Sequence, residues 1–162
     1  MCRITVGKDC SSQQTSSGLF KCYRKKMARY SECRQSLEFF KETNSVISQT
    51  KAFGKITVVK ASVLGSGDAS GYFIIDRAGR LISPMTNISI KTSKRKSTVA
   101  VVYPKAEVWP IVLQFPQAKS LANGGKQLLF KQMVLNGCLG CTKVGIATVA
   151  YDFKANGRFA KS

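Results

Sequence analysis

The six cysteines are the residues of this chain best suited to covalent chemistry. They stand near the two ends of the sequence: Cys2, Cys10, Cys22, Cys33, Cys138 and Cys141. Their even number predicts a disulfide framework in an oxidising compartment. Their grouping predicts that the two ends of the chain meet. A bridge between the ends would close a loop of about a hundred residues and contribute about 4 kcal/mol in the chain-entropy account of disulfides.

Spacing restricts the pairing. Cys22 and Cys33 are eleven residues apart in a segment whose pattern predicts a helix, which separates them by about 16 Å along its axis. A disulfide needs Cα atoms within about 7 Å. We therefore expect each of these two cysteines to pair with the N-terminal arm or with the turn that holds Cys138 and Cys141, and we expect those last two cysteines not to pair with one another.

Three other uses of the cysteines stay open. Reduced thiols would act as small buried hydrophobic groups. A four-cysteine zinc site would draw on Cys138 and Cys141, although the spacing of Cys22 and Cys33 does not match a second half-site. Cys138-Leu-Gly-Cys141 also has the spacing of a dithiol oxidoreductase, but it lies near the C-terminus rather than after the first strand of a strand-helix-strand unit.

The absence of histidine argues against catalysis. Histidine is the commonest general base, the usual partner of serine and cysteine nucleophiles, and a frequent metal ligand. A lysine-serine dyad needs no histidine, but the sequence alone does not support any particular pair. The eight acidic residues are scattered. We predict no enzymatic activity, no catalytic residue, no cofactor and no metal site.

Basic residues dominate the surface chemistry. Twenty-six lysines and arginines stand against eight acids, giving a formal net charge of +18. Such an excess favours an anionic partner. The predicted contact residues form two groups, one in the expected helix and one around a strand-turn-strand; they are Arg24, Lys25, Arg29, Lys91, Lys94, Arg95, Lys96 and Lys105. For residues 94 to 96 taken alone, an ordinary solvated loop is an equally good interpretation.

The sequence therefore predicts an exported or periplasmic binding protein, stabilised by disulfides, that engages an anionic macromolecule or an acidic protein surface. The first alternative is a cytosolic nucleic-acid-binding protein with reduced or zinc-bound cysteines. The second is a structural subunit of an envelope or secretion assembly. The sequence leaves the oligomeric state open.

Hydrophobic periodicity predicts the elements that must position these residues. We expect one α+β domain over residues 1 to 162, with a cysteine-containing arm and flexible loop at 1–18, an amphipathic helix at 19–43, and mostly β structure at 55–162. The helix should pack on a mainly antiparallel sheet of about six to eight strands. No apolar run is long enough to span a membrane.

Strand-like segments lie at 55–64, 72–76, 80–83, 87–91, 98–103, 109–115, 127–135 and 144–153. A helix over residues 126 to 135 is the alternative interpretation of that segment. Residues 44 to 50 are expected to be a polar break. Glycine-containing turns are expected at 77–79 and 154–157. Pro110 predicts that the strand at 109–115 is an edge strand or begins after the proline.

Overall fold

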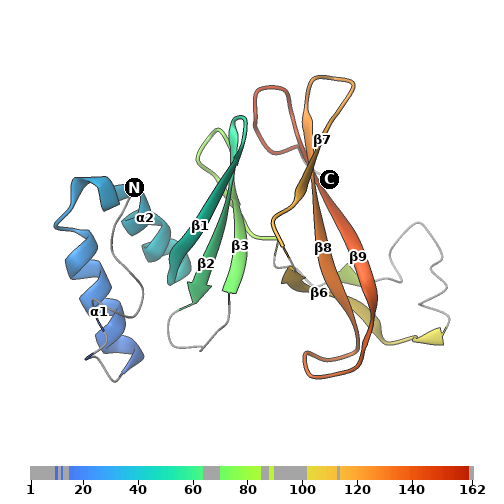
Figure 1. Ribbon diagram of the computed structural model, residues 1–162, viewed down its shortest axis with the longest axis horizontal. Coiled ribbons are helices and arrows are strands. Elements are labelled where there is room, and N and C mark those ends of the chain that lie inside the picture. Colours follow the sequence, from blue (N-terminus) through green and yellow to red (C-terminus); the bar gives the residue numbers. More distant parts are fainter. Residues whose placement is uncertain are drawn as a thin grey trace. The chain divides into compact units, whose positions relative to one another are not determined.

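The computed structural model describes residues 10, 12, 15–63, 70–84, 88–89, 102–112 and 114–160. These residues form an α+β protein with antiparallel pairing, which confirms the expected class. They contain two helices rather than one, and nine strands in two sheets rather than one sheet of six to eight. The elements (Figure 1) are α1 (Ser16–Met27), the 3-10 turn η1 (Ser31–Cys33), α2 (Arg34–Thr43), β1 (Ser45–Phe53), β2 (Ile56–Val63), β3 (Ser70–Ile75), β4 (Leu81–Ile82), β5 (Ile88–Ser89), β6 (Ala106–Val112), β7 (Gln117–Ser120), β8 (Lys126–Asn136) and β9 (Lys143–Phe153).

The single helix expected over residues 19 to 43 is in fact α1 and α2. Helix α1 begins when the Thr15 hydroxyl accepts a hydrogen bond from the amide of Gly18 at 3.1 Å. It ends in a tight turn, where the amides of Arg29 and Tyr30 bond back three residues, and Tyr30 is extended. Both helices turn their apolar stripes to one core, so the spacing of hydrophobic residues continues across the break. Periodicity alone therefore did not reveal the interruption.

The chain forms two compact units, the first within residues 1–50 and 59–71 and the second within residues 51–58 and 72–162. The first unit has a core built largely by its helices. Tyr23 and Met27 of α1 and Phe40 of α2 are buried there, together with Val46 of β1. The aromatic ring of Phe40 lies 5.6 Å from that of Phe20, measured between centroids. The apolar stripe of the predicted helix thus covers a neighbouring helix as well as the start of a strand.

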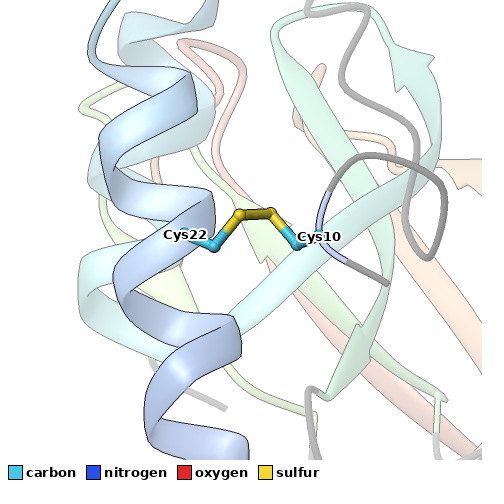
Figure 2. Close-up of a disulfide and its surroundings, with 2 residues drawn as sticks. All are labelled: Cys10 and Cys22. Atoms are coloured by element: carbon cyan, nitrogen blue, oxygen red, sulfur yellow. A yellow bond between two sulfur atoms is a disulfide. The ribbon is translucent and has the colours of Figure 1, made fainter. Parts of the chain in front are cut away.

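Disulfides join the described cysteines. Cys10 pairs with Cys22 and fixes the arm to α1, as Figure 2 shows. Of the two partners expected for Cys22, the N-terminal arm or the turn with Cys138 and Cys141, the structure shows the first. Cys33 is also disulfide-bonded. The prediction that Cys138 and Cys141 do not pair with one another is wrong. Cys138 bonds Cys141, three positions away, and their Cα atoms are 5.0 Å apart. Neither of the two disulfides with both halves described joins the first segment of the chain to the last, and Cys2 lies outside the described residues.

Strand β8 organises the second unit. One edge of β8 pairs with β9 along nearly its whole length, and the other edge pairs with β7 and then with β6. The long β8–β9 hairpin is visible in Figure 1. Leu128 and Phe130 of β8 are fully buried in a core with Tyr72, Ile74 and Phe153. Alternation along β8 places these side chains on the same face of the sheet.

Several strand assignments need correction. Residues 45–50, expected in a polar break, belong to β1, because its pairing with β2 outweighs its polar composition. By contrast, the strand expected at 127–135 is confirmed as β8, and the alternative of a helix there is not. Strand β7 was not predicted. Residues 102 and 103, expected at the end of a strand, lie outside the strands, and the remainder of that segment falls outside the described residues.

Pro110 lies within β6 rather than before it, and β6 is an interior strand between β5 and β8. The register of β6 on β8 shifts between Val108 and Val112, around the proline. This irregularity accommodates a residue that cannot donate to the ladder, so the prediction of an edge strand was wrong.

The described helices are all too short or too polar to cross a lipid bilayer.

Candidate anion-binding site

Two turns of the second unit meet and form the candidate site. The first turn, residues 76–80, connects β3 to β4, and its ends are closed by a hydrogen bond from the amide of Asp76 to the carbonyl of Arg80 at 3.1 Å. The second turn, residues 154–158, follows β9. It is closed by the amide of Lys154 bonding the carbonyl of Arg158 at 2.9 Å. The sequence predicted both turns, and the structure confirms them.

A side chain inside each turn fixes its shape. Oδ1 of Asp76 accepts hydrogen bonds from the amides of Ala78 and Arg80 at 2.8 and 3.0 Å. Oδ1 of Asn156 accepts the amide of Arg158 at 3.0 Å. Asp and Asn favour such turns because their short side chains can replace a backbone acceptor. The backbone of both turns is therefore held by local bonds.

Direct bonds then join one turn to the other. The amide of Arg77 donates to the carbonyl of Gly157 at 3.1 Å, and the amide of Phe159 donates to Oδ2 of Asp76, also at 3.1 Å. Nη2 of Arg80 reaches the carbonyl of Phe159 at 3.3 Å. We call this joined pair, residues 76–80 and 154–159, the double turn.

Gly157 makes this close approach possible. Its φ is +82°, in the left-handed region that favours glycine. A Cβ atom at this position would lie 2.6 Å from Cβ of Lys55 and 3.2 Å from Cβ of Arg77. Any larger residue would clash with Lys55, outside the double turn, and press on Arg77 within it.

Asp76 is the buried centre of the double turn. Its side chain is inaccessible to solvent, while that of its ion-pair partner Arg80 remains 56% exposed; Nη2 of Arg80 lies 2.7 Å from Oδ2. Burial opposes ionisation and is the largest single influence on this carboxyl. The bonds from the Phe159 amide, the Arg80 guanidinium and the amides of Arg80 and Ala78 together outweigh burial and hold the pKa of Asp76 below its ordinary value. Asp76 is therefore an ionised structural group.

A hollow of about 360 Å³ opens on the double turn. It is lined by Ala78, Arg80, Lys154, Arg158 and Phe159, and we call it the basic hollow. The side chains of Lys154 and Arg158 are exposed, and no carboxylate among the described residues forms an ion pair with either. Asp76 offsets one positive charge of the three that line the hollow. A net positive charge therefore remains on a rigid, solvent-accessible surface.

The chemistry of the basic hollow is that of oxyanion recognition. Arginine offers a planar fork of donors that matches phosphate, sulfate or carboxylate, and lysine adds a mobile point charge. Nε and Nη2 of Arg80 donate to Oδ2 of Asp76, which holds this guanidinium in one orientation.

The contact residues predicted in the first unit lie at one end of a helix. Arg24 and Lys25 occupy the last turn of α1 and are exposed, and Arg29 lies just beyond its end and is also exposed. Basic side chains at this end complement the partial negative charge of the helix carbonyls. The position of these basic residues is therefore explained in part by their stabilising effect on α1 itself.

Of the second predicted group, Lys105 is exposed in a turn beside Gly137. Lys91, Lys94, Arg95 and Lys96 lie outside the described residues.

Sequence reasoning missed Arg80, Lys154 and Arg158, because they are spread over two distant turns. A weak signal was present in the sequence. The two turns have similar sequences, Arg77-Ala-Gly-Arg80 and Lys154-Ala-Asn-Gly-Arg158, which differ in length by the inserted asparagine. Only the fold shows that the two patterns face one site.

Comparison of the chain with protein-family models, with curated proteins and with solved structures finds no match.

Proposed function

We propose that this protein is an exported or periplasmic, disulfide-stabilised binding protein without enzymatic activity, which engages an anionic macromolecule or an acidic protein surface. The observation that carries the proposal is the basic hollow. There Lys154 and Arg158 project from a preorganised double turn without a carboxylate partner among the described residues. The basic end of α1, with Arg24, Lys25 and Arg29, is a second contact surface in this proposal.

Rigidity supports a binding role for the double turn. Hydrogen bonds within and between the turns hold the backbone, and a buried carboxylate orients Arg80. A surface that is already ordered loses little conformational entropy when it binds a partner. Exposed cations on such a surface also attract an anion over distances close to the Debye length, about 8 Å at physiological salt.

The chemistry of the double turn supports binding rather than catalysis. Asp76 is the only carboxylate in the double turn, and its oxygens accept hydrogen bonds from Arg80, Ala78 and Phe159. A general base needs a free lone pair directed at the substrate. The chain also contains no histidine to take that role.

The disulfides support an oxidising compartment. The described cysteines are all in disulfides, a state that persists mainly in exported proteins. The rival, a cytosolic nucleic-acid-binding protein, requires these cysteines to be reduced or bound to zinc.

Two measurements test the proposal. Free thiols are counted in freshly isolated, denatured and unreduced protein, and we expect none. Binding to dextran sulfate and to uncharged dextran is then compared across a salt series. We expect binding to dextran sulfate alone, weakening steeply as salt increases. Equal binding to both polymers would overturn the proposal. Six free thiols together with a preference for one oligonucleotide sequence or shape would establish the rival.

A further inference from the structure

The Cys138–Cys141 disulfide, which we call the hairpin disulfide, is more exposed to solvent than the Cys10–Cys22 disulfide, which we call the helix disulfide. It bridges the loop at one end of the β8–β9 hairpin, where Cys138 is exposed and Cys141 is half-buried. Leu139 between them is 65% exposed. By contrast, Cys10 is 1% exposed within the core of the first unit. An external reagent can therefore approach the sulfur of Cys138 far more easily than that of Cys10.

The hairpin is held together without this disulfide. Strands β8 and β9 pair in one register from Lys126 opposite Phe153 to Val134 opposite Gly145, and after a register shift Leu135 lies opposite Lys143. The amide of Asn136 then bonds the carbonyl of Thr142 at 3.1 Å, and the amide of Cys141 bonds the carbonyl of Cys138 at 3.0 Å. These bonds already bring the two cysteines close together. Breaking the disulfide would leave the ladder in place.

The two disulfides also constrain the unfolded chain differently. The hairpin disulfide joins residues three positions apart, and the helix disulfide joins residues twelve positions apart. A shorter loop removes less conformational entropy from the unfolded state. The hairpin disulfide therefore contributes less to folding than the helix disulfide, and its reduction costs the folded protein less stability.

We propose that Cys138–Cys141 is a site of reversible modification by external thiols, which the Cys10–Cys22 disulfide is not. The thiolate of a low-molecular-weight thiol attacks Sγ of Cys138; the Sγ–Sγ bond breaks, and Cys141 leaves as a thiolate that takes up a proton. The product is a mixed disulfide on Cys138. A second thiolate then attacks the sulfur of the bound thiol. This releases Cys138 as a thiol and the two external thiols as one disulfide, so that two electrons pass to the protein.

The surroundings of the hairpin loop favour a negatively charged thiol. Lys143 follows Cys141 by two residues, and Cβ of Lys105 would lie 3.4 Å from a Cβ at Gly137, next to Cys138. Both lysines are exposed. Positive charge at this loop attracts an anionic thiol and stabilises the departing thiolate. Glutathione, which is anionic at neutral pH, has the required chemistry.

The test is a time course of reduction of the full native protein by reduced glutathione, sampled by acid quench, alkylation and peptide mass spectrometry. We expect Cys138 and Cys141 to become alkylated at least tenfold faster than Cys10 and Cys22. Simultaneous reduction of both disulfides, or earlier reduction of Cys10–Cys22, would overturn the proposal.

Single-cysteine variants test the direction of attack. With oxidised glutathione, Cys141→Ser should form a mixed disulfide on the exposed Cys138 several-fold faster than Cys138→Ser forms one on the half-buried Cys141. Equal rates would contradict the assignment of Cys138 as the attacked sulfur. The double variant Cys138→Ser/Cys141→Ser should retain the circular-dichroism spectrum of the parent, because the β8–β9 ladder remains. A lost β signal would show that the bond is structural and would also overturn the proposal.

Discussion

The backbone amide of Phe159 donates a hydrogen bond to the buried carboxylate of Asp76 at 3.1 Å, across 83 positions of the sequence. This bond links the turn after β9 to the turn between β3 and β4. It places Lys154 and Arg158 beside Arg80, and so creates a concentration of positive charge that neither turn has alone.

Removal of the buried carboxylate should loosen the double turn. Asp76→Asn removes the charge that pairs with Arg80. The backbone amides of Ala78 and Arg80 still have an acceptor, the neutral Oδ1 of the asparagine. Loss of one partner of a buried, hydrogen-bonded ion pair commonly costs about 3–5 kcal/mol. Because Asn keeps part of the hydrogen bonding and Arg80 is half-exposed, we expect a loss of about 2–3 kcal/mol in the free energy of unfolding, measured by urea denaturation at pH 7. An unchanged free energy would contradict the structural role of Asp76.

The same carboxylate predicts a stability loss in acid. The pKa of Asp76 in the folded protein lies below its ordinary value of 3.8. Its stabilising contribution is therefore fully present above pH 3.8 and is lost as the pH falls through the folded-state pKa. The difference in unfolding free energy between the parent and Asp76→Asn should shrink as the pH is lowered below 3.8. A difference that is constant from pH 7 to pH 2 would show that ionisation of Asp76 does not stabilise the fold.

Gly157 should tolerate no side chain. In Gly157→Ala, the new methyl group would meet Cβ of Lys55 and of Arg77, in addition to the strain of a positive φ. Gly79→Ala is the matched control, because Gly79 has a φ of +78° but no atom within 4 Å of the added Cβ. We expect the control to lose about 1 kcal/mol from backbone strain and Gly157→Ala to lose about 2–4 kcal/mol. Equal losses, measured by thermal and chemical denaturation, would show that Lys55 and Arg77 do not pack tightly around Gly157.

Two buried tyrosines predict a loss of stability in alkali. Burial raises the pKa of Tyr72 above 10.0; burial also raises that of Tyr151, where a hydrogen bond with Gln132 opposes part of the shift. Between pH 10 and the folded-state pKa values, the unfolded chain loses protons that the folded chain retains, so stability falls as the pH rises through this range. The double variant Tyr72→Phe/Tyr151→Phe should show a weaker decline above pH 10, measured by urea denaturation at each pH. An identical decline in parent and variant would contradict the burial of both phenols.

The class of the fold and its local turns were predictable from the sequence, because each depends on neighbouring residues. Asn156-Gly157 favours a tight turn by backbone preference, and the alternation of residues along β8 and β9 favours strands. Strand β1 was missed because its residues 45–50 are mostly polar and depend on pairing with β2. The two helices were taken for one because their apolar residues share a core.

The candidate site could not be predicted, because it depends on contacts between distant segments. Nothing local to Arg80 indicates that Lys154 and Arg158 lie beside it. The pairing of Cys138 with Cys141 was missed for a related reason. The sequence gives their separation, but only the path of the β8–β9 loop brings their sulfur atoms together.

The basic end of α1 should contribute more to helix stability than to binding. In Arg24→Gln/Lys25→Gln, the helix carbonyls lose two favourable charges, and we expect a loss of about 0.5–1.5 kcal/mol in the free energy of unfolding. Binding to dextran sulfate should fall less than in a variant of the basic hollow with the same change of charge. A larger fall in binding would make the helix end the principal contact surface.

The central claim is that the basic hollow binds the anionic partner, and the most direct measurement is the salt dependence of dextran sulfate binding by Lys154→Gln/Arg158→Gln. The matched control, Lys119→Gln/Lys131→Gln, removes the same charge from exposed positions on β7 and β8. In a logarithmic plot of affinity against salt concentration, each lost contact with an anionic group should lower the slope by roughly 0.7–0.9, as for phosphate contacts. We expect the slope of the hollow variant to fall by roughly 1.5 and that of the control to change little. Equal slopes in the two variants would contradict the claim, because they would show that only total charge matters.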